Sequence, residues 1–349
     1  MELSLFYFAN DSAADGDRYR LLMEGAKFAD AHGFAAVWTP ERHFHPFGGL
    51  YPNPSVTGAA IAAVTEHVKI RAGSVVAPLH HPLRIAEEWS VVDNISGGRV
   101  GLSFASGWHA DDYVLRPENY QDRRKLLAEY VQTVRSLWRG EAATFQNGVG
   151  DPHDVRIFPP PVQRDLPVWV TSAGSVETFR AAGRLGAGVL THLLDQDVDG
   201  LAAKLTAYRT ALAERPDADG WPGHVALMIH TFLDDDEDRA REIVRAPLSD
   251  YMRSSLHLLL SAQLDGRRKV DVSTLSEEDV DFMVEQAFDR YFDFGLLGSV
   301  PKAAAAVERF RSIGVDEVAC LIDFGVPTSS VLGGLTKLAE LRTTTAAAS

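Results

Sequence analysis

The chain has 349 residues, more than one hydrophobic core usually holds but within the range of one large α/β barrel. Hydrophobic residues make up 46% and charged residues 23% of the sequence, as in ordinary globular proteins and unlike disordered or fibrous ones. The formal net charge of -14 would repel a nucleic-acid backbone or an anionic membrane, so we expect neither as a partner.

The start of the chain and its single cysteine predict where the protein works. Residues 1–8 lack the basic start of a signal peptide, and no apolar stretch reaches the roughly 18 residues that span a bilayer. Cys320 has no second cysteine to form an internal disulfide, and it lies in an apolar run. We therefore expect a protein of the reducing cytoplasm.

Short apolar runs rich in β-branched and aromatic residues alternate with longer amphipathic segments, which is the pattern of βαβ units around a parallel sheet. Strands are predicted over residues 3–8, 35–39, 68–76, 100–105, 168–172, 188–192, 224–232 and 317–323. Helices are predicted over residues 19–32, 54–65, 82–95, 119–138, 176–185, 198–212, 301–313 and 329–341. Eight such strands close a barrel, so the predicted fold class is α/β, a (β/α)8 TIM barrel.

Two stretches are longer than a plain barrel requires. Residues 139–166 are rich in Gly and Pro, and residues 234–300 form a larger insertion between predicted strands seven and eight. No composition shift marks a domain boundary, so we expect one domain over residues 1–342, followed by a disordered tail at residues 343–349.

The insertion begins and ends at the rim of the predicted barrel. We expect it to hold no strand, but a helix through Arg245, a second over residues 248–264, a basic turn at Arg267-Arg268-Lys269 and a helix over residues 277–292. It is either extra scaffold or part of a dimer surface, or it is a mobile lid that excludes water. In the second case the basic turn would dock an acidic carrier that bears the substrate.

In barrels of this type the active site lies on the loops that follow the strands. Polar side chains after the predicted strands include His43, His45, Ser74, His80, His81, Ser106, His109, Ser172, Ser175, His192, His230 and Asp323. Histidine exchanges protons most readily near neutral pH. The segment 172–175 lies between a strand and a helix, where exposed amides favour an anion such as phosphate. A plain turn that caps the helix is the alternative interpretation.

A metallohydrolase is a less favoured alternative. His43, His45, His192 and Asp323 are partly similar to the ligands of barrel metallohydrolases. However, Ser172 stands where a histidine after the fifth strand is expected, and no candidate for a carboxylated lysine follows the fourth. We therefore assign no residue to a metal.

Five segments together resemble a known family. They are GFAAVWTPERHF (33–44), PNPSVTGAAIAA (52–63), GSVVAPLHHPLRIAEEWSVVDNISGGRVGLSFASGW (73–108), PVWVTSAGSVETFRAAG (167–183) and GVDEVACLIDFG (314–325). They are similar to the bacterial luciferase-like, FMN-dependent monooxygenases over about residues 1–342, most of all to the subgroup that accompanies nonribosomal peptide and polyketide pathways.

This resemblance implies a barrel with an insertion before its last strand, reduced FMN as cofactor, and a flavin C4a-hydroperoxide, formed with dioxygen, as oxidant. It also implies a homodimer and a small-molecule or carrier-protein-bound substrate whose identity the sequence does not give. No dinucleotide fingerprint opens a βα unit, so a separate flavin reductase is the expected partner. The same barrel also serves deazaflavin (F420)-dependent dehydrogenases, and a flavin-binding protein without turnover is a third alternative.

The family's cofactor-binding positions fall here on Gly73, Ser74, Ser106, Arg123, Ala173, Gly174, Ser175 and Thr178. A non-prolyl cis peptide is expected between Gly73 and Ser74, beneath the flavin ring. Ala173, Gly174 and Ser175 would form the phosphate loop. Ser106 stands where luciferase has a phosphate-binding arginine, so Arg123 or Arg124 is the expected substitute.

The implied catalytic residues are Arg42, His43 and His109. Arg42 replaces a histidine that serves proton transfer in luciferase, and a guanidinium is no base at neutral pH. We therefore expect oxygenation without light emission from an aldehyde. The three side chains would donate protons or hydrogen bonds to peroxide and substrate. Dry walls would come from Phe44, Phe47, Trp108 and Phe324.

Overall fold

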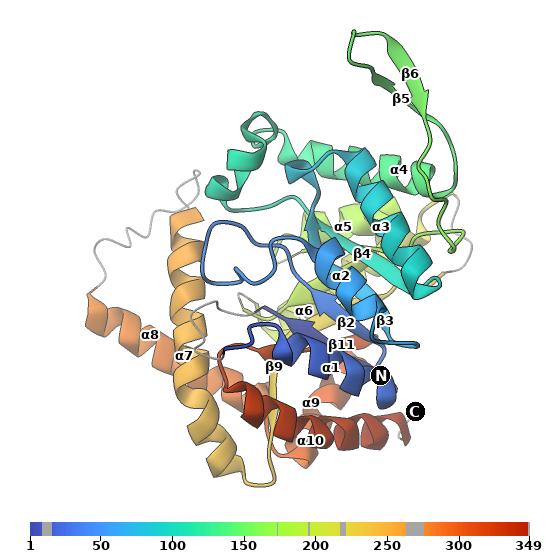
Figure 1. Ribbon diagram of the computed structural model, residues 1–349. Coiled ribbons are helices and arrows are strands. Elements are labelled where there is room, and N and C mark those ends of the chain that lie inside the picture. Colours follow the sequence, from blue (N-terminus) through green and yellow to red (C-terminus); the bar gives the residue numbers. More distant parts are fainter. Residues whose placement is uncertain (9–15, 173, 195, 217–220, 263–275, 348–349) are drawn as a thin grey trace.

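A computed structural model describes residues 1–8, 16–172, 174–194, 196–216, 221–262 and 276–347. Parallel strands pair in the order β1-β2-β3-β4-β7-β8-β9-β11, and β11 pairs with β1 to close the barrel. They are β1 (Glu2–Tyr7), β2 (Ala36–Thr39), β3 (Lys69–Val76), β4 (Val100–Ala105), β7 (Val168–Thr171), β8 (Gly188–His192), β9 (Val225–Leu233) and β11 (Glu317–Asp323). The predicted (β/α)8 barrel is confirmed (Figure 1).

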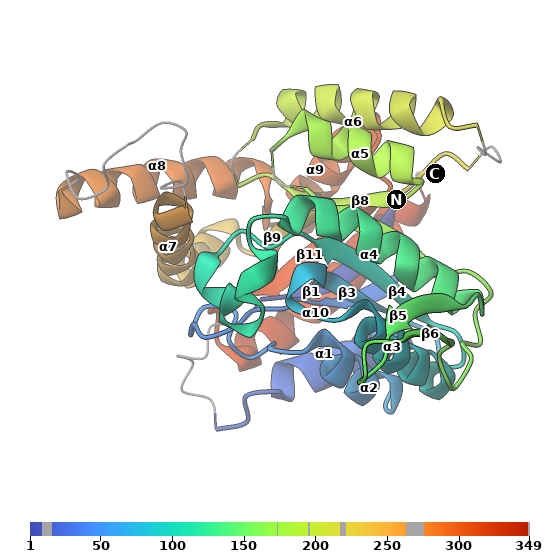
Figure 2. The ribbon, with the colours of Figure 1, turned by 90° about the horizontal axis from the view of Figure 1, so that it is seen from above.

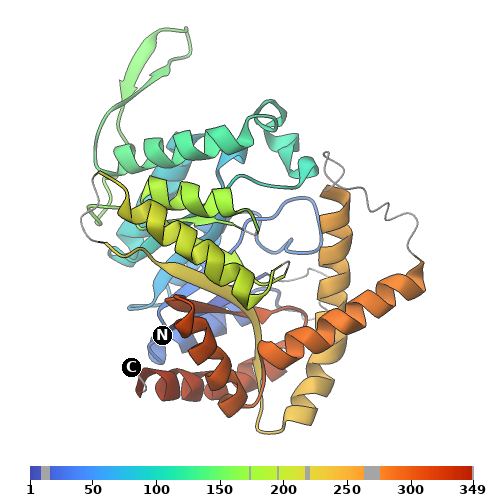
Figure 3. The same cartoon turned by 180° about the vertical axis from the view of Figure 1, so that it is seen from behind.

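Helices surround the barrel and cover its outer face (Figures 2 and 3). They are α1 (Arg20–Ala31), α2 (Pro54–Ala62), α3 (Pro82–Ser96), α4 (Arg123–Trp138), α5 (Val176–Leu185), α6 (Val198–Ala213), α7 (Glu237–Ala262), α8 (Glu277–Phe294), α9 (Val300–Ser312) and α10 (Thr328–Ala347). Short 3-10 turns are η1 (Ala77–Leu79), η2 (Ala110–Leu115) and η3 (Pro117–Asn119). No helix in these described ranges is both long and apolar enough to cross a bilayer.

Local signals explain where several helices begin and end. The Asn53 side chain accepts hydrogen bonds from the amides of Ser55 and Val56 at the start of α2. Gly97 and Gly186 end α3 and α5 in the left-handed conformation, with φ of 66° and 62°. These capping residues set the start of α2 and the ends of α3 and α5.

Arg99, in the SGGR segment before β4, is buried and forms hydrogen bonds with the backbone of neighbouring segments. Its guanidinium donates to the carbonyls of Ser96, Val68 and Thr65, each at 2.7 Å. These bonds tie the end of α3 to the loop between α2 and β3. This specific segment of the sequence therefore serves the barrel scaffold.

The insertion contains a strand that was not expected. β10 (Leu296–Gly298) pairs in parallel with β9, Leu296 lying opposite Thr231. Its three residues are buried, but a run of this length is too short to show a strand period in the sequence. The prediction of an insertion without strands was therefore wrong.

The predicted break between two helices around Arg245 was also wrong. One helix, α7, passes through this region with Pro247 inside it. Val244 and Leu248 are buried on both sides of the proline. Packing of these side chains offsets the hydrogen bond that proline removes from the helix. The basic turn Arg267-Arg268-Lys269 lies outside the described residues.

The expected disordered tail is largely helical. α10 continues to Ala347, and Thr345 is buried. The Thr345 carbonyl accepts a hydrogen bond of 2.8 Å from Nη2 of Arg311 on α9. This tertiary contact orders residues 343–347, which the small polar composition of the segment did not indicate.

The Gly- and Pro-rich stretch between α4 and β7 carries a two-stranded hairpin. β5 (Ala143–Gln146) pairs antiparallel with β6 (Pro152–Val155), and the hairpin projects from the barrel (Figure 1). The ring of Phe145 packs on that of His81, with centroids 5.1 Å apart. The Phe158-Pro159 peptide after the hairpin is cis.

Candidate active site

A buried carboxylate, Glu41, organises the loop that follows β2. Its Oε1 accepts hydrogen bonds from Nε2 of His43 at 2.8 Å and from Nε2 of His80 at 2.5 Å. Its Oε2 accepts the amide of Val76 at 2.7 Å. Burial alone would raise the pKa of Glu41, but the hydrogen bonds from the two histidines and from the Val76 amide lower it overall. Glu41 is thus held as a carboxylate between two imidazoles.

Arg42 forms a second buried group with residues from the loop after β4. Its Nη1 donates to Oδ2 of Asp112 at 2.8 Å, and Nδ1 of His109 lies 3.7 Å from Oδ1 of the same carboxylate. Arg42 is 3% exposed, yet its Nε and Nη2 have no hydrogen-bond partner in the described part of the chain. The exposed Trp108 ring lies 5.4 Å from the guanidinium. Two buried donors are therefore available to a ligand.

The peptide bond between Gly73 and Ser74 is cis, as expected. A Cβ at Gly73 would lie 2.8 Å from Cε2 of Phe6 and 3.0 Å from Cε3 of Trp38, so only glycine fits there. The Ser74 hydroxyl forms a hydrogen bond with that of Thr171 at the end of β7. This pair joins the ends of β3 and β7.

The expected phosphate loop leads into α5. Gly174 and Ser175 are exposed, and Ala173 lies outside the described residues. Ser175 caps α5 without a side-chain hydrogen bond, although its carbonyl accepts the amide of Thr178 at 3.0 Å. The hydroxyl of Ser172 is buried and has no hydrogen-bond partner in the described ranges. The helix thus begins without a side-chain cap and is preceded by a hydroxyl without a partner, and both features suit an anion.

Ser106, directly after β4, and Arg123, at the start of α4, belong to one network of contacts. The Ser106 carbonyl accepts the Tyr113 hydroxyl at 2.5 Å, and the Tyr113 ring packs on Tyr120 with centroids 5.0 Å apart. The Arg123 guanidinium lies 4.2 Å from the centre of the Tyr120 ring and donates to the Tyr120 carbonyl at 2.7 Å. Arg123 is thus linked to Ser106 through two tyrosines.

The insertion packs against the ends of the strands through aromatic rings. Tyr251 of α7 contacts Phe47, in the loop after β2, with ring centroids 4.8 Å apart. His230 of β9 is surrounded by Tyr251, Tyr291 and Phe324, with ring centroids 4.5, 5.9 and 5.3 Å away. Burial lowers the pKa of His230 to about 3, so its imidazole is neutral.

Asp323, the last residue of β11, carries a carboxyl that is easily protonated. Burial raises its pKa to about 7, and the hydrogen bond of 2.9 Å from the Tyr51 hydroxyl only partly offsets this effect. Asp323 therefore contributes a group that titrates near neutral pH to this end of the barrel.

The structure brings the three predicted catalytic residues into neighbouring groups. Arg42 and His109 share the carboxylate of Asp112, and His43 is held by Glu41. Neither carboxylate was assigned a role from the sequence. For Glu41 a signal existed, since an acid directly before Arg42 and His43 follows a strand end, whereas Asp112 lies in a 3-10 turn without any motif.

The metallohydrolase arrangement does not form. Nδ1 of His45 accepts the amide of Phe47 at 3.0 Å, and Asp323 is bonded to Tyr51. Among the described residues, His45 and Asp323 belong to no cluster of potential metal ligands.

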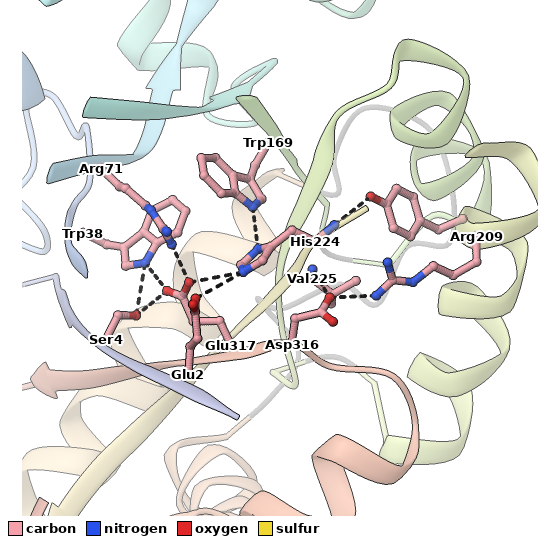
Figure 4. Close-up of polar contacts among 11 residues, drawn as sticks. Glu2, Ser4, Trp38, Arg71, Trp169, Arg209, His224, Val225, Asp316 and Glu317 are labelled. Carbon is pink, nitrogen blue, oxygen red and sulfur yellow. Dashed lines mark hydrogen bonds and ion pairs between the residues drawn. The ribbon is translucent and has the colours of Figure 1, made fainter. Parts of the chain in front are cut away.

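A different polar cluster fills the opposite end of the barrel, where the strands begin (Figure 4). Oε1 of Glu317 accepts the Ser4 hydroxyl at 2.5 Å and the Trp38 indole N–H at 2.8 Å, and Oε2 accepts from Arg71. Burial would raise the pKa of Glu317, but Arg71 and these donors lower it overall.

His224 lies beside Glu317 in this cluster (Figure 4). Its Nε2 is 3.5 Å from Oε2 of Glu317 and 3.6 Å from Oε2 of Glu2, and its Nδ1 is 2.9 Å from the Trp169 indole nitrogen. An indole N–H only donates, so Nδ1 of His224 must be the acceptor and Nε2 carries the proton.

Comparison with known proteins places this chain in one family. The family model for luciferase-like monooxygenases matches residues 1–317. The oxygenase component of the flavin-dependent trigonelline monooxygenase of Acinetobacter baylyi is 25% identical over 342 residues, which cover 93% of this chain and 90% of that protein. The 4-hydroxyprotoasukamycin monooxygenase of Streptomyces nodosus subsp. asukaensis is 29% identical over 217 residues, covering 60% and 58%.

Solved structures share the fold over nearly the whole chain. Monooxygenase RslO1 from Streptomyces bottropensis has a TM-score of 0.80 at 24% identity, covering 97% of this chain and 98% of its own. The oxygenating constituent of the FMN-bound 3,6-diketocamphane monooxygenase of Pseudomonas putida has a TM-score of 0.73 at 18% identity, covering 97% of both chains. An F420-dependent secondary alcohol dehydrogenase reaches 0.71 at 18% identity, covering 99% of both. The resemblance expected from the sequence is confirmed: this chain belongs to the luciferase-like monooxygenases.

Proposed function

We propose that this chain oxygenates a small organic or carrier-tethered substrate with reduced FMN and dioxygen, and that a separate flavin reductase supplies the reduced flavin. The family supports a flavin-dependent monooxygenase. The trigonelline relative is itself an oxygenase component, which supports the two-component arrangement. The absence of a dinucleotide fingerprint after any strand of this sequence agrees with an external source of reducing equivalents.

The observation that carries this proposal is the unpartnered hydroxyl of Ser172, which directly follows β7 and precedes α5. It is 3% exposed, and the first amides of α5 face no side-chain cap. A phosphate there would accept from the hydroxyl and the amides and would interact favourably with the helix dipole. The residues present therefore fit the phosphate of FMN, which Gly174 and Ser175 would also contact.

Bound reduced FMN would supply the activation of dioxygen, and the side chains at the strand ends would direct it. Nε and Nη2 of Arg42 would orient an oxygen atom of the reacting groups by hydrogen bonds. His43, held at Nε2 by Glu41, would hold and deliver a proton. His109 would supply a further donor beside Arg42, because both side chains lie at the carboxylate of Asp112. Arg42 cannot serve as the base, which is why we propose oxygenation without luciferase-type light emission.

Water must be kept from the reacting oxygen, and the aromatic residues differ in what they contribute. Phe47 and Phe324 are buried and form dry walls already. Phe44 and Trp108 are exposed, so they would do so only after a ligand or the insertion covers them. We propose that α7 and α8 provide this cover as a lid. Docking of an acidic carrier at residues 267–269 remains part of the same proposal.

The test is product formation by the purified chain with FMN, NADH, a flavin reductase and heavy-isotope dioxygen. Incorporation of the heavy oxygen into a product supports oxygenation, because free reduced flavin consumes dioxygen without transferring it to carbon. Reduction of F420 by an alcohol without incorporation would instead support the dehydrogenase suggested by the F420-dependent structural neighbour. Tight NADH binding with flavin reduction in the absence of reductase would contradict the two-component arrangement.

A further inference from the structure

Two clusters of carboxylates and histidine in the described residues bring three potential ligand atoms within 4.8 Å of one another. One is Glu41, His43 and His80 at the carboxyl ends of the strands, and the other is Glu2, His224 and Glu317 at the opposite end. Both combine nitrogen and oxygen ligands, as zinc and other borderline divalent metals prefer. They differ in whether the ligand atoms are free to bind a cation.

The cluster around Glu317 is not suited to a metal. The Trp169 N–H occupies Nδ1 of His224, which places the imidazole proton on Nε2, the atom that faces the carboxylates. A metal at Nε2 would require loss of this proton as well, leaving an imidazolate. Oε2 of Glu317 is already engaged by the Arg71 guanidinium, whose charge also opposes a nearby cation.

The cluster around Glu41 meets the requirements. His43 and His80 come from different loops, and both direct Nε2 at the same carboxylate oxygen. No donor of the described residues is bonded to Nδ1 of either ring, so each can move its proton to Nδ1 and present Nε2 as a ligand. The Val76 amide fixes the other Glu41 oxygen and so orients the carboxylate.

The distances allow a cation after a small adjustment. The nitrogen atoms lie 2.8 and 2.5 Å from Oε1 of Glu41, which are hydrogen-bond distances. Tetrahedral ligands about 2.1 Å from zinc are about 3.4 Å apart, so each ring must withdraw by roughly 1 Å or less. The His80 side chain is 26% exposed, which gives a cation a path from solvent and leaves room for water as a fourth ligand.

We propose that Glu41, His43 and His80 form a binding site for one divalent transition-metal ion of the zinc class, with an open fourth position. Binding would replace the shared hydrogen bonds of the carboxylate by metal bonds and would occupy Nε2 of His43. Metal binding itself is independent of the proposed function. Only the expected consequence, loss of oxygenation because His43 is withdrawn from proton transfer, rests on it.

The proposal is tested by metal binding to the whole protein without flavin. Wild-type protein is dialysed against Zn²⁺ and against Co²⁺, with zinc content, calorimetric affinity and cobalt absorption as readouts. We expect one ion per chain and the intense visible bands of four-coordinate cobalt. His80→Ala should weaken the affinity by at least about 100-fold and abolish these bands, since a direct ligand matters more than the 10- to 100-fold typical of outer-shell partners.

His153→Ala is the matched control, because it removes an exposed histidine on β6 that belongs to neither cluster. It should bind the ion as the wild type does. Equal affinity in wild type and His80→Ala, or six-coordinate cobalt spectra alone, would overturn the proposal and indicate surface binding.

Product formation is measured separately, with and without bound zinc. A zinc site that forms but leaves oxygenation unchanged would confirm the metal site and contradict the role of His43 in the proposed function. A chain that binds no zinc at this site but oxygenates its substrate would contradict the metal site and leave the proposed function supported. The two proposals can therefore fail independently.

Discussion

The two ends of the barrel both contain buried charges, but they use them differently. At the end where the strands begin, both oxygens of Glu317 accept hydrogen bonds from side chains of neighbouring strands (Figure 4). At the other end, Arg42 is as deeply buried but keeps Nε and Nη2 without partners, and the Ser172 hydroxyl has none in the described ranges.

On this contrast we distinguish a structural cluster from the proposed binding site. A buried polar group without a partner costs about 1 to 3 kcal/mol, a cost that a bound ligand with matching polar atoms would remove. A filled cluster instead links strands: Glu317 joins β11 to Ser4 of β1, Trp38 of β2 and Arg71 of β3. Substitutions at the first end should therefore affect stability, and those at the second should affect binding and turnover.

The largest effect is expected for Glu317→Gln. This change leaves Arg71 as a buried charge without its partner and should lower the free energy of unfolding by about 3 to 5 kcal/mol. Urea denaturation measures it. Glu2→Gln, in the same cluster but with an exposed side chain, is the control and should cost less than about 0.5 kcal/mol. Similar losses for both would mean that the cluster is not a scaffold.

His43→Ala should leave stability nearly unchanged and lower the oxygenated product per FMN oxidised by about 100-fold, as expected for loss of a general acid. The reaction with a flavin reductase, quantified for product and flavin turnover, gives this ratio. His32→Ala is the control, because His32 is exposed and its ring stacks on Phe28 of α1, at the outer surface. Unchanged coupling in His43→Ala would reassign His43 to loop structure.

Asp323 should make the free energy of unfolding depend on pH, because its pKa is raised whereas that of Glu317 is lowered. Between the usual 3.8 and about 7, the folded chain keeps a proton on Asp323 that the unfolded chain has released. The free energy of unfolding should therefore fall as pH rises through this window, by about 4 kcal/mol relative to Asp323→Asn, which cannot titrate. Urea unfolding at several pH values tests this difference. Parallel pH profiles for the two proteins would contradict it.

The sequence predicted the barrel well because every main strand is an apolar run bounded by turn residues. Where it failed, tertiary packing decided the outcome. β10 is too short for a period, Pro247 is accommodated inside α7, and Thr345 is ordered by Arg311. Helix propensity and hydrophobic periodicity depend on neighbours in the sequence, so they do not predict these tertiary contacts.

The site was predicted in its positions more than in its connections. Arg42, His43 and His109 became candidates because they follow strands, and the resemblance supplied the Gly73-Ser74 cis peptide, which the structure contains. The pairing of Arg42 with Asp112 joins residues far apart in the chain. No spacing in a single sequence shows such a pair, since it depends on how two loops meet at the barrel end.

The smallest effect is expected for Ser172→Ala. This variant tests the proposed phosphate site at the carboxyl ends of the strands. The hydroxyl is buried without a partner in the described ranges, so its removal also removes a desolvation cost and should raise the free energy of unfolding slightly. If it donates to the phosphate of FMN, the variant should bind FMN about tenfold more weakly, because a hydrogen bond to a charged group contributes about 1.5 kcal/mol or more.

Riboflavin provides the control for this last prediction, because it has the same ring system and lacks the phosphate. Fluorescence or calorimetric titration should show equal riboflavin affinity for wild type and Ser172→Ala. The loss must therefore appear with FMN alone to place the phosphate at α5. Equal losses with both flavins would move Ser172 to the ring-binding part of the site. No loss with either would mean that this end of the barrel tolerates an unpartnered hydroxyl for a reason unrelated to the cofactor.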